Sequence, residues 1–240
     1  MVGSSQECGE DACATCPFRA FSLCGNVLDE LEGVRQTTVP RLRGAAPPRQ
    51  ILYEKSCPSQ EVQFLCRGWA FRFVQFSDGR RQILSLMMPG EIFSTAAVFA
   101  DRLHFSVLSV TDVRFTSFPR ETVRQALDAS PVMEHLGGLC ASEMQEKDLT
   151  LADLGRRSAD ERIAHFVLRL IEKLTLRGEG DGNRFPCPLR QQHIADLTGL
   201  TQIHVSRVLS SFRQAGIFDL SRSILTVQDP VRLERIGRPR

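Results

Sequence analysis

The stretch Gln191–Ser210, which reads QQHIADLTGLTQIHVSRVLS, decides the fold of the carboxyl-terminal part of the chain. A helix-turn-helix needs a small residue where its helices cross and, four positions later, a turn residue that tolerates a left-handed backbone. Ala195 and Gly199 have this spacing. Thr201 is placed to cap the second helix. Apolar residues occupy the positions that the crossing buries: Ile194, Leu200, Val205, Val208, Leu209 and Phe212. Any two-helix hairpin is the alternative, but the joint match favours a helix-turn-helix.

The outer face of the second helix carries the residues that we expect to read DNA: Gln202, Ile203, Ser206 and Arg207. In the major groove an arginine can bond bidentately to guanine O6 and N7, and we assign this role to Arg207. Ser206 can reach a base or a phosphate, and Gln202 an adenine or the backbone. Ile203 neither donates nor accepts, so it contacts a thymine methyl group or excludes water.

A short hairpin and an excess of positive charge follow this helix. Phe218–Val227 contains two strand-like pieces around Ser221-Arg222-Ser223, which predicts the wing of a winged helix with Arg222 available to a phosphate. Residues 189–240 carry eight arginines and four acidic residues, a net charge of +4. The first 188 residues carry 22 basic and 24 acidic groups, a net charge of −2. The basic excess at this end favours a nucleic-acid partner.

Residues 51–118 have the pattern of strands. Trp69, Phe71 and Phe73 alternate with other residues, Asp78-Gly79 supplies a hairpin turn, and the run 82–88 returns as the next strand. Residues 105–118 form a third such stretch. Short strands separated by turns predict a β-barrel, β-roll or jelly roll. The preceding residues 40–50, rich in Pro, Gly and Arg, are interpreted as a connector.

A long helix is predicted from Ser130 to about Leu154, with Ser130 as its cap and Pro131 at its first turn. Its apolar residues are spaced mostly by three, four or seven positions: Val132, Leu136, Cys140, Met144, Leu151 and Leu154. Such a helix packs on a core or forms a dimer, and the length of the stripe favours a dimer helix. A second amphipathic helix follows, in which Ser158 and Glu161 form a capping box.

Composition excludes several classes of protein. The chain has 240 residues, of which 42% are apolar, so an overall disordered chain is not expected. No apolar run is long enough to span a membrane and no secretory signal is visible, so we expect a cytoplasmic protein with no membrane partner. No phosphate-binding loop, nucleophile elbow or metalloprotease motif occurs, and we therefore expect no enzyme.

The motif D-G-R-R-Q-I-L…M-P-G-E-I (residues 78–92), the segment VTDVRFTSFP (110–119) and the helix-turn-helix together resemble the Crp/Fnr superfamily of transcription regulators. The resemblance is greatest for its Fnr/FixK-type branch. It implies an α+β fold: a cyclic-nucleotide-binding-like β-roll, a long dimerisation helix and a winged helix-turn-helix. The domains would be a cysteine-rich segment (1–26), the β-roll (27–129), the dimerisation helix (130–156) and the DNA-binding domain (157–240). It also implies a homodimer on two-fold-symmetric DNA, with RNA polymerase as a partner.

The resemblance has two departures that bear on function. Many family members have Glu at the position of Ile203, so the outer bases of the site should differ here. Members that bind cyclic nucleotides carry adjacent Arg and Ser residues after the Gly-Glu of the β-roll. After Gly90-Glu91 this chain offers only the separated Arg102 and Ser106, so we expect no cAMP.

Four cysteines near the amino terminus suggest the signal: Cys8, Cys13, Cys16 and Cys24. Fnr-type oxygen sensors hold a [4Fe–4S] cluster through three such cysteines and one in the β-roll, and Cys13, Cys16 and Cys24 resemble the first three. The fourth position falls at Thr116, which is not a normal cluster ligand, so Cys8 or, less readily, Cys66 would replace it. Zinc and free redox thiols remain alternatives. A haem ligand, a nitrogen oxide or a small effector in the β-roll is the alternative signal.

The remaining cysteines and two histidines have simpler interpretations. Cys57, Cys140 and Cys187 are read as small buried or incidental residues, although oxidation of Cys187, just before the first DNA-binding helix, could disturb binding. His104 and His204 could suggest a haem or a metal. A lone histidine is more often packed or solvated.

Overall fold

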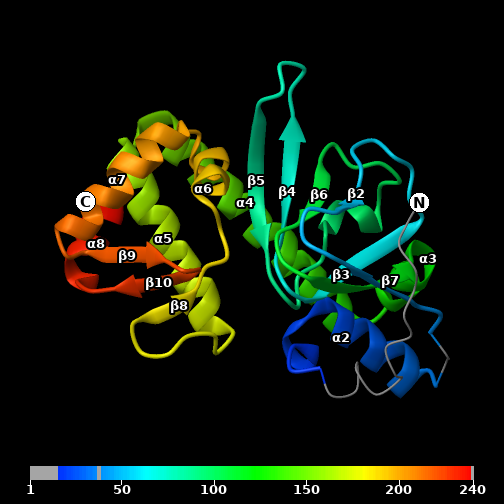
Figure 1. Cartoon of the computed structure of the whole chain (residues 1–240). Coiled ribbons are helices and arrows are strands. Elements are labelled where there is room, and N and C mark those ends of the chain that lie inside the picture. Colours follow the sequence, from blue (N-terminus) through cyan, green and yellow to red (C-terminus); the bar gives the residue numbers. More distant parts are fainter. Residues whose placement is uncertain (1–15, 37–38, 239–240) are drawn as a thin grey trace. The chain divides into compact units, whose positions relative to one another are not determined.

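A computed structural model describes residues 16–36 and 39–238. It divides the chain into two compact units, Met1–Gln145 and Glu146–Arg240, each considered separately below (Figure 1). Within the described ranges no helix is both long and apolar enough for a transmembrane segment. The fold class is α+β, as the sequence predicts.

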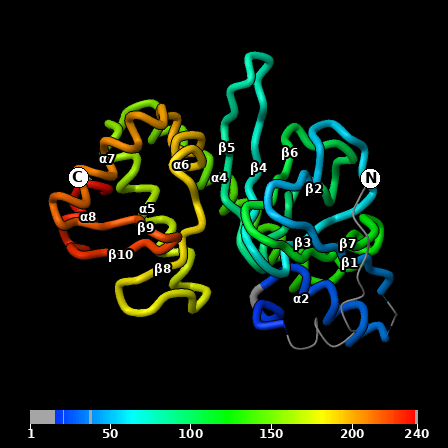
Figure 2. The backbone as a smooth tube through the Cα atoms, viewed as in Figure 1, coloured from blue at the N-terminus to red at the C-terminus, as the bar shows by residue number. Residues whose placement is uncertain are grey.

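The first unit is built on two antiparallel sheets, which Figure 2 traces as a tube. One has the strand order β1-β7-β3 and the other β2-β6-β4-β5. The strands are β1 (Leu42–Ala46), β2 (Ile51–Tyr53), β3 (Glu61–Arg67), β4 (Ala70–Gln75), β5 (Arg81–Met87), β6 (Ser106–Ser109) and β7 (Val113–Pro119). The predicted hairpin is confirmed, because β4 pairs with β5 across a turn that contains Asp78 and Gly79.

The predicted alternation in β4 is also confirmed. Trp69, Phe71 and Phe73 are all buried, and the rings of Phe71 and Phe73 meet edge to face with centroids 5.7 Å apart. Large aromatic side chains on one face of a strand provide much of the apolar area that holds two sheets together.

The interpretation of residues 40–50 as a connector is wrong, because they contain β1. The reason is a tertiary contact that local composition does not show: β1 pairs with β7, and Gly44 lies against the ring of Phe115. A Cβ on Gly44 would lie 2.2 Å from the nearest ring atom, so only glycine fits this approach.

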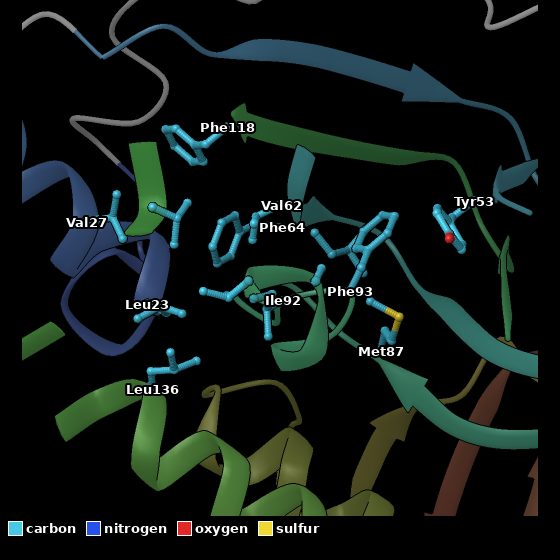
Figure 3. Packing of buried hydrophobic residues seen from close by; sticks show 14 of the residues in the cluster. Leu23, Val27, Tyr53, Val62, Phe64, Met87, Ile92, Phe93, Phe118 and Leu136 are labelled. Atoms are coloured by element: carbon cyan, nitrogen blue, oxygen red, sulfur yellow. The ribbon is translucent and has the colours of Figure 1, made fainter. Parts of the chain in front are cut away.

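Helices close the core of the first unit. They are η1 (Arg19–Phe21), α2 (Leu23–Leu28), η2 (Asp29–Val34), η3 (Thr95–Val98), α3 (Arg120–Ala126) and the beginning of α4 (Ser130–Arg156). Figure 3 shows Leu23 and Val27 of α2 and Leu136 of α4 beside the buried rings of Phe64 and Phe118. The amino-terminal helix and the long helix therefore share one core with the sheet.

The long helix begins at the predicted residue and ends close to its predicted end, but its capping differs. It is a single helix of 27 residues, Ser130–Arg156. Ser130 is its first residue and donates its hydroxyl to the Glu134 carboxylate at 2.6 Å, so the prediction that Ser130 caps the helix is wrong. The carbonyl of Ala129 instead accepts the N–H groups of Val132 and Met133.

The second unit is a winged helix. Its elements after α4 are α5 (Ala159–Leu176), β8 (Arg184–Pro186), α6 (Gln191–Thr198), α7 (Gln202–Gln214), β9 (Phe218–Ser221), β10 (Ile224–Val227) and α8 (Pro230–Gly237). The capping box is confirmed: Ser158 Oγ accepts from Glu161 N–H, and the Glu161 carboxylate accepts from Ser158 N–H. The sheet has the order β8-β10-β9, and β8 is a strand that the sequence pattern did not reveal.

Arg120 is a buried anchor of the first unit, and its removal should destabilise that unit. Its guanidinium donates to the carbonyls of Ala97, Ser59 and Ala100 at 2.5–2.7 Å. Arg120→Met keeps the apolar stem but leaves these acceptors unpaired, so we expect a loss of about 2–4 kcal/mol in the free energy of unfolding measured in urea. Arg102→Met, which removes one exposed bond to Ser56, is the control and should change it little. Equal losses in both variants would contradict the assignment.

Candidate nucleic-acid interface

The turn between α6 and α7 is set by a left-handed residue. Gly199 has φ 65° and ψ 30° at the end of α6, and the N–H of Leu200 donates to the Ala195 carbonyl at 3.1 Å. Thr201 then caps α7, because its Oγ1 accepts from the N–H of His204 at 3.3 Å. The predicted turn glycine and cap are both confirmed.

One face of α7 packs against the core of the second unit. Val205, Val208 and Phe212 are buried, and the ring of Phe212 lies 5.0 Å from that of Phe218 in β9. Because side chains three, four and seven positions apart share a helix face, this packing turns the opposite face of α7 outward.

The outward face holds the four residues that the sequence assigns to DNA. Gln202 and Arg207 are exposed, Ser206 is half-buried, and 66% of Ile203 is exposed. Within the described part of the chain, Arg207 has no carboxylate at salt-bridge distance. An arginine and an isoleucine left open on a rigid helix form a surface suited to base edges and methyl groups.

The wing is a tight hairpin with its arginine at the tip. Arg222 and Ser223 connect β9 to β10, and both have left-handed backbones, with φ 50° and 60°. The carbonyl of Ser223 accepts from the N–H of Cys187 at 2.8 Å, which ties the turn to the chain before α6. Two residues with positive φ form the turn type that two-residue hairpins favour, and this one exposes the guanidinium of Arg222.

The sequence analysis missed α8, although its signal is present. Asp229 caps this helix by accepting from Arg232 N–H at 2.9 Å, and Pro230 is its first residue. An Asp-Pro start is a recognised helix signature. Arg232 of α8 also donates to the carbonyl of Ala215 at 3.3 Å, so α8 supplies a hydrogen-bond donor to the carboxyl end of α7.

Two of the four amino-terminal cysteines lie in the part of the chain that the structure describes. Cys8 and Cys13 lie outside the described residues. Cys16 and Cys24 are both half-buried, and Cys24 packs against the core from α2. Among residues 16–36 and 39–238 no three His, Cys, Asp or Glu side chains are grouped closely enough to hold a metal ion.

Thr116 is unsuitable as a ligand, for a structural reason. It is buried in β7, and its hydroxyl donates to the Leu42 carbonyl at 3.3 Å. The thiol of Cys66 in β3 donates to the Phe64 carbonyl at 3.7 Å. Phe18 lies against Gly90, whose N–H donates to the Leu65 carbonyl at 2.8 Å, so the residues next to Cys16 reach the end of β3.

Cys187 is an inert thiol. It is buried, and burial raises its pKa from 9.0 to about 11. Since the thiolate is the reactive form, this cysteine is protected at neutral pH, which argues against its oxidation as a switch. Cys57 is exposed.

Arg102 and Ser106 each form a hydrogen bond with the backbone after β2. Arg102 donates to the Ser56 carbonyl at 2.7 Å, and Ser106 Oγ accepts from the N–H of Lys55 at 2.9 Å. Nearby, Arg72 of β4 forms a largely buried ion pair with Glu143 of α4 at 3.0 Å, and Glu143 also accepts from the Thr95 hydroxyl at 2.9 Å. This network fastens α4 to the β-roll within the first unit.

Comparison with known proteins agrees with both halves of the fold. Residues 45–130 match the family described as a cyclic nucleotide-binding domain, and residues 161–236 match the Crp-like helix-turn-helix domain. The nitrogen fixation regulation protein FixK of Bradyrhizobium diazoefficiens is 30% identical over 226 residues, which cover 94% of this chain and 93% of FixK. The transcriptional activatory protein AadR of Rhodopseudomonas palustris is 28% identical, over 92% of this chain and 91% of AadR.

A solved structure shows the same fold. FixK2 from Bradyrhizobium japonicum superposes with a TM-score of 0.74 at 23% identity, covering 82% of this chain and 98% of FixK2. The relatives are named as regulators, which agrees with the lack of an enzyme motif. The β-roll, the helix-turn-helix and the FixK relationship over nearly the whole length together place this chain in the Crp/Fnr superfamily of DNA-binding transcription regulators, with the Fnr/FixK-type members.

Proposed function

We propose that the protein is a homodimeric regulator that binds a two-fold-symmetric DNA site through α7 and controls transcription through RNA polymerase. The observation that carries this proposal is the outward face of α7, where Ile203 and Arg207 are exposed on a helix that is fixed by buried contacts on its other side. A recognition helix of this kind places its amino-terminal residues against base edges in the major groove. The name of AadR, an activatory protein, favours activation.

The dimer contact that we propose is the open stripe of α4. Met144 is 66% exposed and Leu151 72% exposed, and they are seven positions apart in the sequence. Gly137 continues the stripe one heptad earlier, where the lack of a side chain permits close approach of a second helix. Seven-residue spacing is the repeat of two packed helices, and exposed apolar residues in this register are covered when the helix pairs with its copy.

We further propose that the signal is oxygen or redox state, sensed by the amino-terminal thiols. Cys13, Cys16 and Cys24 would hold a [4Fe–4S] cluster, with Cys8 or Cys66 as fourth ligand. When bound, the cluster would supply an oxygen-labile group. With Cys66 as the fourth ligand, Cys16, Cys24 and Cys66 would have to move together, because they are not grouped in the described part of the structure.

Contacts within the first unit would connect these thiols to the dimer helix. Leu23 and Leu136 share the core, and the side-chain amide of Asn26 lies 3.1 Å from His135 Nδ1. Burial lowers the pKa of His135, so its ring is neutral at pH 7 and Nδ1 can accept from Asn26. A change at Cys24, in the same helix as Asn26, therefore reaches α4 through direct contacts.

Arg207 and Arg222 should differ in how they affect DNA binding. Arg207→Ala should weaken binding to the preferred site by about 1–3 kcal/mol and relax base choice at one position of each half-site. Arg222→Ala should weaken binding to all sequences alike and reduce the salt slope by about 1. The measurement is selection from a random-sequence duplex library, followed by titration at several salt concentrations. A uniform loss in Arg207→Ala would contradict the base contact.

Leu151→Glu should disrupt the dimer. A carboxylate in the paired stripe would be desolvated without a partner, and we expect the dimer dissociation constant to rise about a hundredfold in sedimentation equilibrium. Leu149→Glu is the matched control, because Leu149 is 45% exposed but lies on another face of α4. Wild-type protein that sediments as a monomer would contradict the proposed dimer.

Protein purified without oxygen should contain iron and acid-labile sulfide in equal amounts, and air should remove both while weakening DNA binding. Cys24→Ser should lose them because a cluster ligand is gone. Cys187→Ser is the control and should keep both, since its buried thiol is inert. Colourless wild-type protein without iron would contradict the cluster and favour zinc, free thiols or another effector.

A further inference from the structure

The end of α4 contacts the turn of the helix-turn-helix directly, and this contact lies wholly within the second unit. The Cδ2 atom of Leu154 would be 2.7 Å from a Cβ on Gly199. The turn glycine therefore has two roles: it supplies the left-handed backbone, and it leaves room for Leu154.

Arg162 of α5 makes the second contact at the same place. Its Nη2 donates to the Leu154 carbonyl at 2.8 Å, its Nε to the Arg157 carbonyl at 2.9 Å, and its Nη1 to the Thr198 carbonyl at 3.3 Å. Leu154 lies in the last turn of α4, and Thr198 is the last residue of α6. One guanidinium thus donates to carbonyl groups at the carboxyl ends of two helices, α4 and α6.

The chemistry favours an arginine at this point. The last carbonyls of a helix have no partner within the helix and carry the negative end of its dipole, so a cation between two such ends is stabilised by both. The planar guanidinium directs its N–H groups in several fixed directions, whereas a lysine ammonium is a single point of charge.

Other contacts fasten the same part of α4 to α5. Lys173 lies 3.0 Å from the Glu146 carboxylate, and His165 Nδ1 lies 2.7 Å from Asp153 Oδ2. The segment 146–156 is therefore attached to the DNA-binding unit along its length, which agrees with the division of the chain between Gln145 and Glu146.

We propose that Arg162 and Leu154 are positioning residues that fix the orientation of α7 relative to the end of the dimer helix. They would thereby determine the spacing between half-sites that the dimer accepts. This inference rests on the proposed function. In a dimer paired along α4, the distance and rotation between the two copies of α7 depend on how each is attached to its α4. Arg162 touches no base in this role and acts through the α6–α7 turn.

The test measures spacing, which a loss of stability alone would not alter. A selected two-fold site is lengthened or shortened by one base pair, which rotates one half-site by roughly 35° relative to the other. For the wild-type dimer we expect affinity to fall about tenfold with each change. For Arg162→Met we expect about tenfold weaker binding to the original site. The further loss of affinity when the spacing changes by one base pair, here called the spacing penalty, should be less than about threefold, because a loose attachment tolerates the rotation.

Arg232→Met is the matched control. It also removes a bond from a guanidinium to a helix-end carbonyl, but this bond joins α8 to Ala215 at the other end of α7 and leaves the end of α4 untouched. It should keep the wild-type spacing penalty. Thermal unfolding confirms that each variant is folded, and Leu154→Ala, expected to relax spacing in the same way, replaces Arg162→Met if that variant does not fold.

The outcomes separate this inference from the proposed function. A folded Arg162→Met or Leu154→Ala dimer that keeps the full spacing penalty overturns the positioning role alone. A spacing penalty relaxed equally in Arg232→Met also overturns it, since the effect would then be general. Wild-type protein that selects no duplex overturns the proposed function and this inference with it.

Discussion

The left-handed backbone of Gly199 is the constraint on which the DNA-binding unit depends. It ends α6 and allows α7 to begin at Gln202, so that Val205 and Phe212 reach the buried side of the unit. Once those side chains are buried, the opposite side of the helix has to face outward, and with it Arg207. A side chain at position 199 would be strained by its φ and would meet Leu154. A single backbone conformation thus selects which residues are available to DNA.

The long helix α4 takes part in two separate cores. Its first half contributes Val132 and Leu136 to the β-roll, and Glu143 pairs there with Arg72. Its second half is bound to α5 through Glu146 and Asp153. Met144 and Leu151 lie between these attachments, and their side chains are exposed. Most of the stability of a helix in a protein comes from tertiary packing, and both halves of α4 obtain it from these contacts.

Local signals in the sequence predicted most of the fold. The capping box at Ser158, the turn at Asp78-Gly79 and the helix-turn-helix each depend on residues within a few positions of one another. The errors have a different cause. β1 exists because Gly44 admits Phe115, and β8 because it pairs with β10, both contacts between distant parts of the sequence. The role of Arg162 could not be predicted for the same reason, because its acceptors are backbone carbonyl groups, which no residue type marks in the sequence.

The candidate functional residues also differ in how far the sequence predicts them. The DNA-facing residues follow from helix periodicity, whereas the sensor depends on which thiols meet in space. Thr116 bonds within its own sheet, where its hydroxyl donates to the Leu42 carbonyl. Cys66 follows Leu65, whose carbonyl binds Gly90 beneath Phe18. α2 packs on the first half of α4 in the core of the first unit. The same core that stabilises the β-roll therefore connects the amino-terminal helix directly to α4.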